Sequence, residues 1–117
     1  MPATSAAERA VVGCLLIDCG LRAQARGLKM SDFADQYLGA VFDCLMSIDG
    51  PADLIIVVDE LEMSNAKPPR GTGWAEFVAA TMDNIPSVEH VREYVAIVRR
   101  SSISRRLSAR SAGGFAR

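Results

Sequence analysis

Apolar residues recur along this chain at intervals of three and four, and glycine or proline interrupts the pattern between segments. Such spacing places side chains on one face of an α-helix, whereas a half-buried strand requires strict alternation. The clearest stripe contains Trp74, Phe77, Val78, Thr81, Met82 and Ile85. Pro86 follows directly and cannot continue a helix. The sequence therefore predicts an all-α fold, a compact bundle of helices.

The core of that bundle has to be aliphatic. Half of the 117 residues are apolar but only 6% are aromatic, so Leu, Val, Ile, Ala and Met must fill most of the interior. A chain of this length suits one compact domain, which buries roughly two-thirds of the surface of the unfolded chain.

Polar residues at N-cap positions divide the chain into about six helices. Ser5 and Glu8 have the spacing of a capping box, and Asp35, Asp53 and Ser87 are placed to cap three later helices. The β-branched run after Asp53 would pass for a strand in isolation, but apolar residues keep the helical step beyond it, so we expect a helix. The expected helices cover about residues 5–16, 18–26, 36–49, 54–65, 73–85 and 87–98.

Charge divides the chain into two parts. Residues 1–98 hold all 14 acidic residues against 7 Lys and Arg, whereas residues 99–117 hold six Arg and no acid. The apolar stripe of the last helix also thins after Val98, so the extension lacks an apolar face to dock on its own core. We predict a helical head domain over 1–98 and, over 99–117, an Arg-rich extension of the last helix that projects to about Arg110 and is frayed after it.

The chain carries no visible catalytic, cofactor-binding or metal-binding constellation. It lacks the phosphate-binding pattern G-x-x-x-x-G-K-S/T, and its one histidine, His90, occupies a position where an exposed polar role is expected. Cys14, Cys19 and Cys44 are odd in number and lack paired ligand spacing, which favours small buried side chains in a reducing cytoplasm. No window approaches the ~18 apolar residues of a membrane span. We therefore expect a cytoplasmic chain that is no enzyme.

Ordered motifs over about residues 5–107 resemble the N-terminal domain of DnaB-type bacterial replicative helicases. Residues 7–18 are similar to the family's opening A-E-x-A-V-L-G-x-L/M-L/I/F-x-D, and residues 28–33 to its L-x-x-x-D-F. Val41-Phe42 matches the family's I-F, and residues 51–61 match P-V-D-x-V/I/L-x-V-x-E/D-L. Further along, Ile85-Pro86-Ser87 matches V/I-P-S/T and residues 94–98 match Y-A/V-x-I/L-V/I. Residues 105–107 match R-x-L.

The resemblance implies a helical head followed by a helical hairpin through which protomers pair. It also implies that the heads form a collar on the hexameric helicase ring, where primase and loader proteins dock. The sequence departs from the family pattern at Ile56, where the family has a polar residue, and at His90, where it has Asn. The second arm of the hairpin, the linker and the motor do not follow, so we expect a part of a longer protein or a small stand-alone relative.

We therefore predict a non-catalytic collar domain that self-associates and binds the C-terminal domain of primase or a helicase loader. Aromatic and Arg residues dominate interface hot spots, but for aromatic residues a plain core role carries more weight. The candidate partner contacts are Phe77, Tyr94, Arg99, Arg105 and Arg106. Two alternatives stay open: a small DNA-binding protein that uses the Arg tail, and a decoy that inserts into a host helicase collar. Few aromatics interleave the Arg cluster, which favours partner or solvent contacts over nucleic acid.

Overall fold

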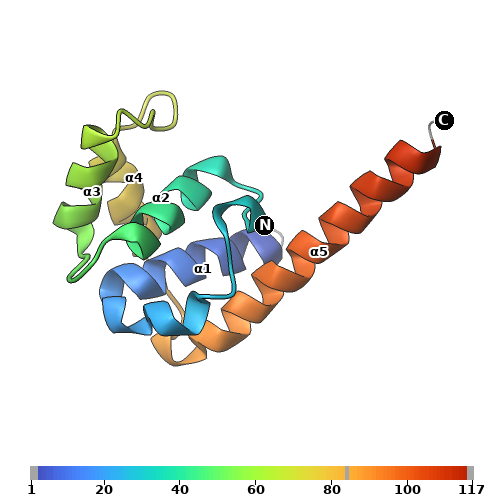
Figure 1. The fold of residues 1–117 in the computed structure, drawn as a ribbon. Helices are drawn as coiled ribbons and strands as arrows, with labels where there is room; N and C mark the ends of the chain where they lie inside the picture. Colours follow the sequence, from blue (N-terminus) through green and yellow to red (C-terminus); the bar gives the residue numbers. More distant parts are fainter. Residues whose placement is uncertain (1–2, 84, 116–117) are drawn as a thin grey trace.

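The computed structural model describes the backbone of residues 3–83 and 85–115, and the side chains of residues 3–83 and 85–108. This part of the chain is helical and contains no strand, as the sequence predicts (Figure 1). Its α-helices are α1 (Ala3–Ile17), α2 (Gln36–Ser47), α3 (Leu54–Met63), α4 (Trp74–Thr81) and α5 (Val91–Phe115). Short 3-10 helices connect them: η1 (Cys19–Ala25), η2 (Met30–Asp32) and η3 (Val88–His90).

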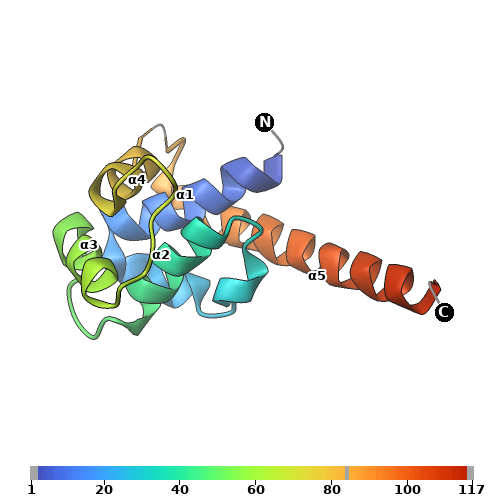
Figure 2. The same cartoon turned by 90° about the horizontal axis from the view of Figure 1, so that it is seen from above.

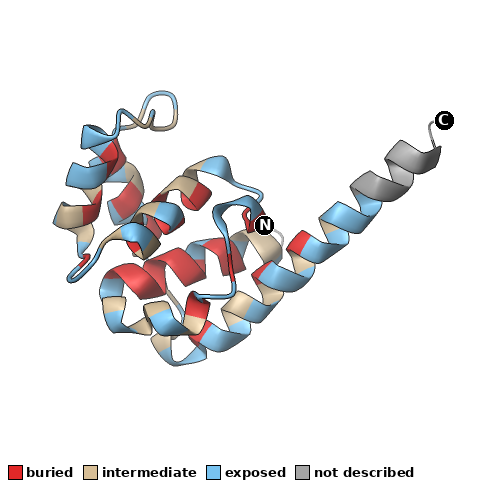
Figure 3. Ribbon diagram, in the orientation of Figure 1, coloured by how far each residue is buried: buried red, intermediate tan, exposed pale blue. Residues whose placement is uncertain are grey.

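Helix α1 forms the centre of the head. Every residue from Val11 to Leu16 is buried, because α2, α4, α5 and η1 all pack against this helix. Figure 3 shows the resulting continuous run of buried residues along α1, in contrast to the largely exposed residues 103–108 of α5. The core is aliphatic, as the composition predicts, with Phe42 and Trp74 among its few aromatic members. Each fully buried Val or Leu side chain contributes about 1.5–3 kcal/mol.

The capping box predicted at the start of α1 is wrong. Ser5 lies inside α1, and Glu8 is only 1% exposed. The Glu8 carboxylate instead accepts hydrogen bonds from the backbone N–H groups of Ala34, at 2.8 Å, and Asp35, at 3.2 Å. A buried carboxylate needs such donors, and the loop before α2 supplies two of them. Glu8 therefore fixes the point at which α2 begins.

The other three predicted caps are confirmed. The Asp35 side chain accepts from the backbone N–H of Tyr37 at 2.8 Å, and Asp53 accepts from Ile56 at 3.0 Å. Ser87 accepts from Glu89 at 3.2 Å, and η3 then runs directly into α5. The β-branched run after Asp53 is helical, as expected, because it lies directly behind a satisfied N-cap.

The predicted and observed ends differ most for two helices. The stripe that begins at Trp74 was expected to stay helical to Ile85, but α4 ends at Thr81 and Ile85 lies outside it. The last helix extends to Phe115 rather than to about Arg110. The expected fraying after Arg110 stays a prediction: the backbone is helical to Phe115, and residues 116–117 lie outside the described part.

Helices α3 and α4 lie side by side at one end of the head (Figures 1 and 2). The Trp74 indole N–H donates to the carbonyl of Ala66 at 2.7 Å, which ties the α3–α4 loop to the start of α4. Helix α5 packs along α1 and then leaves the head; in both views it points away from α3 and α4. No helix in the described residues is long and apolar enough to cross a membrane.

Candidate interaction surfaces

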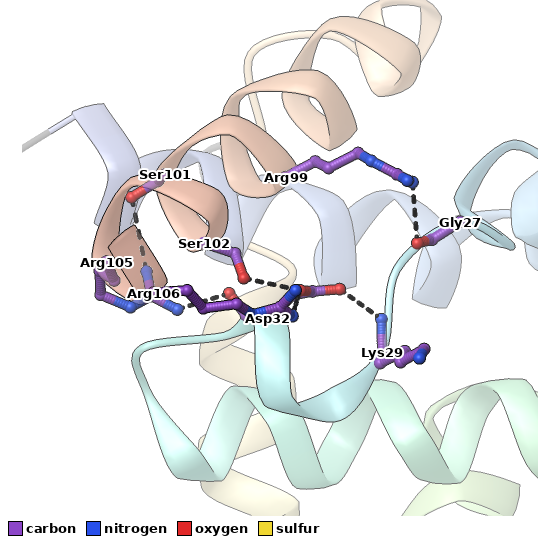
Figure 4. A network of polar contacts seen from close by, with 8 residues as sticks. All are labelled: Gly27, Lys29, Asp32, Arg99, Ser101, Ser102, Arg105 and Arg106. Atoms are coloured by element: carbon purple, nitrogen blue, oxygen red, sulfur yellow. Dashed lines mark hydrogen bonds and ion pairs between the residues drawn. The ribbon is translucent and has the colours of Figure 1, made fainter. Parts of the chain in front are cut away.

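A polar cluster holds α5 where it leaves the head, and we call it the anchor (Asp32, Ser102, Arg105 and Arg106). The Ser102 hydroxyl donates to Asp32 Oδ1 at 2.6 Å, and Arg106 Nη2 lies 2.5 Å from the same oxygen. The backbone N–H of Lys29 donates to Asp32 Oδ2 at 2.7 Å. Figure 4 shows these donors converging on Asp32, whose side chain is 8% exposed. The carboxylate therefore links η2 to the middle of α5.

The anchor stabilises the charged form of Asp32. Burial alone would raise the pKa of this carboxyl, but the hydrogen bonds from Ser102 and Lys29 and the positive charges of Arg106 and Arg99 outweigh it. The net effect is a pKa below the ordinary value of 3.8. Asp32 is thus an ionised acceptor at neutral pH, and its hydrogen bonds are of the stronger, charge-assisted kind.

Two further arginines bind backbone carbonyls of the head. Arg99 donates to Gly27 O at 3.0 Å, and Arg105 donates to Asp32 O at 2.8 Å (Figure 4). The three arginines predicted to contact a partner, Arg99, Arg105 and Arg106, therefore all have partners within the chain. The expectation that the extension could not dock on its own head is wrong for its first two turns, because polar contacts replace the missing apolar face.

The opposite side of this helix is exposed. Ile103 and Leu107 are 47% and 56% exposed. Arg100 is exposed as well, and the spacing of three and four residues places it on the same side as the other two. We call these three residues the outer stripe, and residues 99–115 of α5 the arm. The side chain of Arg110, part of the predicted Arg cluster, lies outside the described residues.

Phe77 lines a shallow cavity of about 230 Å³ on the head, which we call the aromatic groove. Its other lining residues are Arg9, Asp35, Leu38, Thr72, Glu76, Ala80 and Thr81. Phe77 is half-buried, with its ring centroid 5.9 Å from that of Trp74 and 6.1 Å from that of Tyr37. Arg9 spans α1 and α4 by donating to Ala80 O at 3.3 Å. The groove thus combines an apolar wall with charged edges.

Tyr94 does not join this groove. It is half-buried on α5, with its ring 6.4 Å from that of His90, which is exposed as the sequence predicts. Sequence reasoning selected Phe77 but missed Arg9 and Glu76, whose positions in helical segments resemble ordinary solvated faces. The packing of α1 against α4 brings Arg9 beside Phe77, whereas Glu76 directly precedes Phe77 on α4.

All three cysteines are unpaired, and Cys14 and Cys44 are poorly suited to nucleophilic chemistry. Burial raises the pKa of the Cys14 thiol, and burial together with the nearby Glu60 and Asp43 carboxylates raises that of Cys44 to about 11. In the described residues, no three His, Cys, Asp or Glu side chains are grouped closely enough to hold a metal ion.

The described residues form a small all-helical head domain from which one anchored helix projects. Residues 1–100 match the family model described as the DnaB-like helicase N terminal domain, and the chain belongs to this family. The structure is similar to the crystal structure of the N-terminal domain of DnaB helicase from Mycobacterium tuberculosis. The TM-score is 0.83 at 25% sequence identity, over 92% of this chain and 79% of that one. No match was found among curated proteins.

The comparisons confirm the family predicted from the ordered motifs. They also confirm the fold class, an all-helical bundle with a long last helix. The family match ends at Arg100. Ile103 and Leu107 of the outer stripe and three of the four anchor residues therefore lie outside the matched segment.

Proposed function

We propose that this domain is the non-catalytic collar module of a replicative DNA helicase, through which protomers associate and a primase C-terminal domain or a helicase loader docks. The observation that carries the proposal is the arm. It leaves the head at a position held by the buried Asp32 and exposes Ile103 and Leu107 to solvent. An apolar stripe on a fixed, projecting helix is suited to bury itself against another chain.

The aromatic groove is the surface that we assign to primase or loader docking. The half-buried Phe77 ring on its apolar wall offers area to bury, and the charged Arg9 and Glu76 at its edge can fix the orientation of a partner. The family supports this role, since the matched solved structure is the N-terminal domain of a DnaB helicase. A reducing cytoplasm, where the three free cysteines stay reduced, is the proposed location.

DNA binding through the Arg tail has less support. Arg99, Arg105 and Arg106 already donate to groups of the head, so binding phosphate would require these contacts to be replaced. A protein that neutralises several phosphates shows a steep loss of affinity with salt. Fluorescence anisotropy with a labelled duplex at increasing salt tests this alternative directly.

Calorimetry with the cognate primase C-terminal domain tests the docking role. We expect binding at about tens of micromolar or tighter, and a loss of about tenfold or more for Ala80→Arg, which fills the groove from an exposed position. Ala79→Arg is the matched control, because Ala79 is its exposed neighbour on α4 and does not line the groove. Absence of heat and of co-elution with primase and with the loader would reject docking.

A further inference from the structure

The loop between α3 and α4, residues 64–73, projects from the head (Figure 1). It carries Lys67 and Arg70, which are both exposed, and no acidic residue occurs in residues 64–75. The head as a whole is acidic, with 14 acidic residues against 7 Lys and Arg in residues 1–98. The loop is therefore a positively charged spot on a negatively charged head.

The backbone around Arg70 forms a defined turn. Pro68 and Pro69 come directly before it, and each fixes its own φ angle. The N–H of Thr72 donates to the carbonyl of Pro69 at 3.1 Å, which closes a β-turn over residues 69–72. Gly71 has a φ of 81°, in the range that a type II turn requires at its third residue. Arg70 thus stands at the corner of a preorganised turn, and a contact made there loses little conformational entropy.

This turn stands at the edge of the aromatic groove. Thr72 lines the groove, and Arg70 precedes it by two residues, a separation of at most about 7 Å along the backbone. The indole of Trp74, bonded to Ala66 at 2.7 Å, holds the two ends of the loop together, and its ring packs against Phe77. A partner that covers Phe77 therefore comes close to the turn.

The charged groups of the loop have no partner within the described part of the chain. No ion pair or side-chain hydrogen bond of Lys67 or Arg70 is formed there. Arg9 and Arg92, by contrast, donate to Ala80 O and to the Gln24 side chain. A guanidinium offers five N–H donors and binds a carboxylate through two parallel bonds. Arg70 retains all of these donors for another molecule.

We propose that Arg70, held by this turn, binds a carboxylate of the protein that docks in the aromatic groove. That partner then presents an apolar side chain to Phe77 and an acidic side chain to Arg70. The inference rests on the docking role proposed above and adds the chemistry of the partner. Because the rest of the head is acidic and repels a carboxylate, the turn also selects the orientation in which the partner docks.

Charge reversal at Arg70 tests the contact. Calorimetry at low salt measures binding of the full chain to the cognate primase C-terminal domain and, in parallel, to the helicase loader. For the one that binds, we expect Arg70→Glu to weaken binding by about tenfold or more, because like charges then face each other. Arg70→Ala should weaken it less and make the affinity less dependent on salt. Arg26→Glu is the matched control, since it makes the same change at an exposed position outside the groove.

Gly71→Ala tests the turn while keeping the charge. A Cβ atom at Gly71 meets no atom within 4 Å, so the substitution acts only through the positive φ, which alanine rarely adopts. We expect binding to weaken by about threefold or more, because Arg70 is no longer held in place before the partner arrives. Unchanged binding of Gly71→Ala would overturn the role assigned to the turn.

Three further outcomes separate this inference from the docking role. If Ala80→Arg weakens binding but Arg70→Glu does not, docking in the aromatic groove stands and only the contact of Arg70 falls. If Arg26→Glu acts as strongly as Arg70→Glu, the effect belongs to the net charge of the head, and the inference falls. If neither the primase domain nor the loader binds the unaltered chain, the docking role and the inference both fail.

Discussion

The Ser102 hydroxyl lies 2.6 Å from the carboxylate of Asp32, a residue seventy positions earlier in the chain, and both side chains are buried. This bond fixes the helix that leaves the head to a turn that belongs to the head. The Asp32 carboxylate also accepts hydrogen bonds from Arg106 and from the backbone N–H of Lys29. One carboxylate therefore holds α5 at the point where it leaves the head. The arm can present its outer stripe in a defined direction only while this contact persists.

Removing either side chain of that bond should destabilise the fold. We expect Ser102→Ala to lower the free energy of unfolding by about 1–2 kcal/mol, and Asp32→Ala by about 2–4 kcal/mol because three donors lose their acceptor. Urea denaturation followed by circular dichroism measures both. Ser104→Ala, at an exposed position two residues further along α5, serves as the control and should stay within about 0.5 kcal/mol of the unaltered chain. Equal effects of the two Ser variants would contradict this role of Asp32.

The same carboxylate should make stability depend on acid pH. The pKa of Asp32 is lower in the folded chain than its ordinary value of 3.8, so the unfolded chain binds a proton more readily. The stabilisation is therefore complete above about pH 4–5 and is lost as the pH falls through the folded pKa. Asp32→Asn should lose less stability than the unaltered chain between about pH 5 and pH 3. Parallel curves of unfolding free energy against pH would show that Asp32 does not contribute.

The sequence predicted the parts of the fold that depend on neighbouring residues. Asp35, Asp53 and Ser87 cap the helices that follow them, because a cap and the backbone N–H groups that donate to it lie within three residues. The charge pattern and the thinning of the apolar stripe after Val98 also predicted the projecting last helix. Ser102 was not identified, because a serine among arginines has the pattern of a solvated face. Its partner is set by tertiary packing, and no local pattern contains it.

Glu8 shows that a local sequence pattern can also suggest a contact that tertiary packing replaces. Its spacing from Ser5 fits a capping box, yet its acceptor atoms serve the backbone of residues 34 and 35, from another segment. We expect Glu8→Ala to cost about 2–3 kcal/mol, because two backbone N–H groups lose a charged acceptor and a buried space is left behind. Glu62→Ala, on the exposed side of α3, should be nearly neutral. If thermal unfolding gives the same loss of stability for Glu8→Ala and Glu62→Ala, the buried contacts of Glu8 do not stabilise the start of α2.

The thiol of Cys44 should react slowly in the folded chain. Its pKa of about 11 leaves roughly one thiol in a thousand ionised at about pH 8, and the thiolate is the reacting form. Mass spectrometry after a short exposure to iodoacetamide should find Cys44 largely unmodified in buffer and fully modified in guanidinium chloride. The rate in buffer should rise about tenfold per pH unit below the pKa. A fast, pH-independent reaction would mean that burial and the nearby carboxylates do not raise the pKa of this thiol.

Gly13 allows α1 to approach α4, and its replacement tests how tightly the head is packed. A Cβ atom built there would lie 2.7 Å from the carbonyl oxygen of Thr81 and would also collide with the flexible Ile85 side chain. Helix propensity alone favours Gly13→Ala by about 1 kcal/mol, but the backbone at Thr81 has to move to admit the methyl group. We therefore expect a net loss of about 1–3 kcal/mol. Ala79→Gly, at an exposed position of α4, calibrates the propensity term in the same denaturation experiment. A gain in stability for Gly13→Ala would mean that α1 and α4 can move apart to admit the methyl group at little cost.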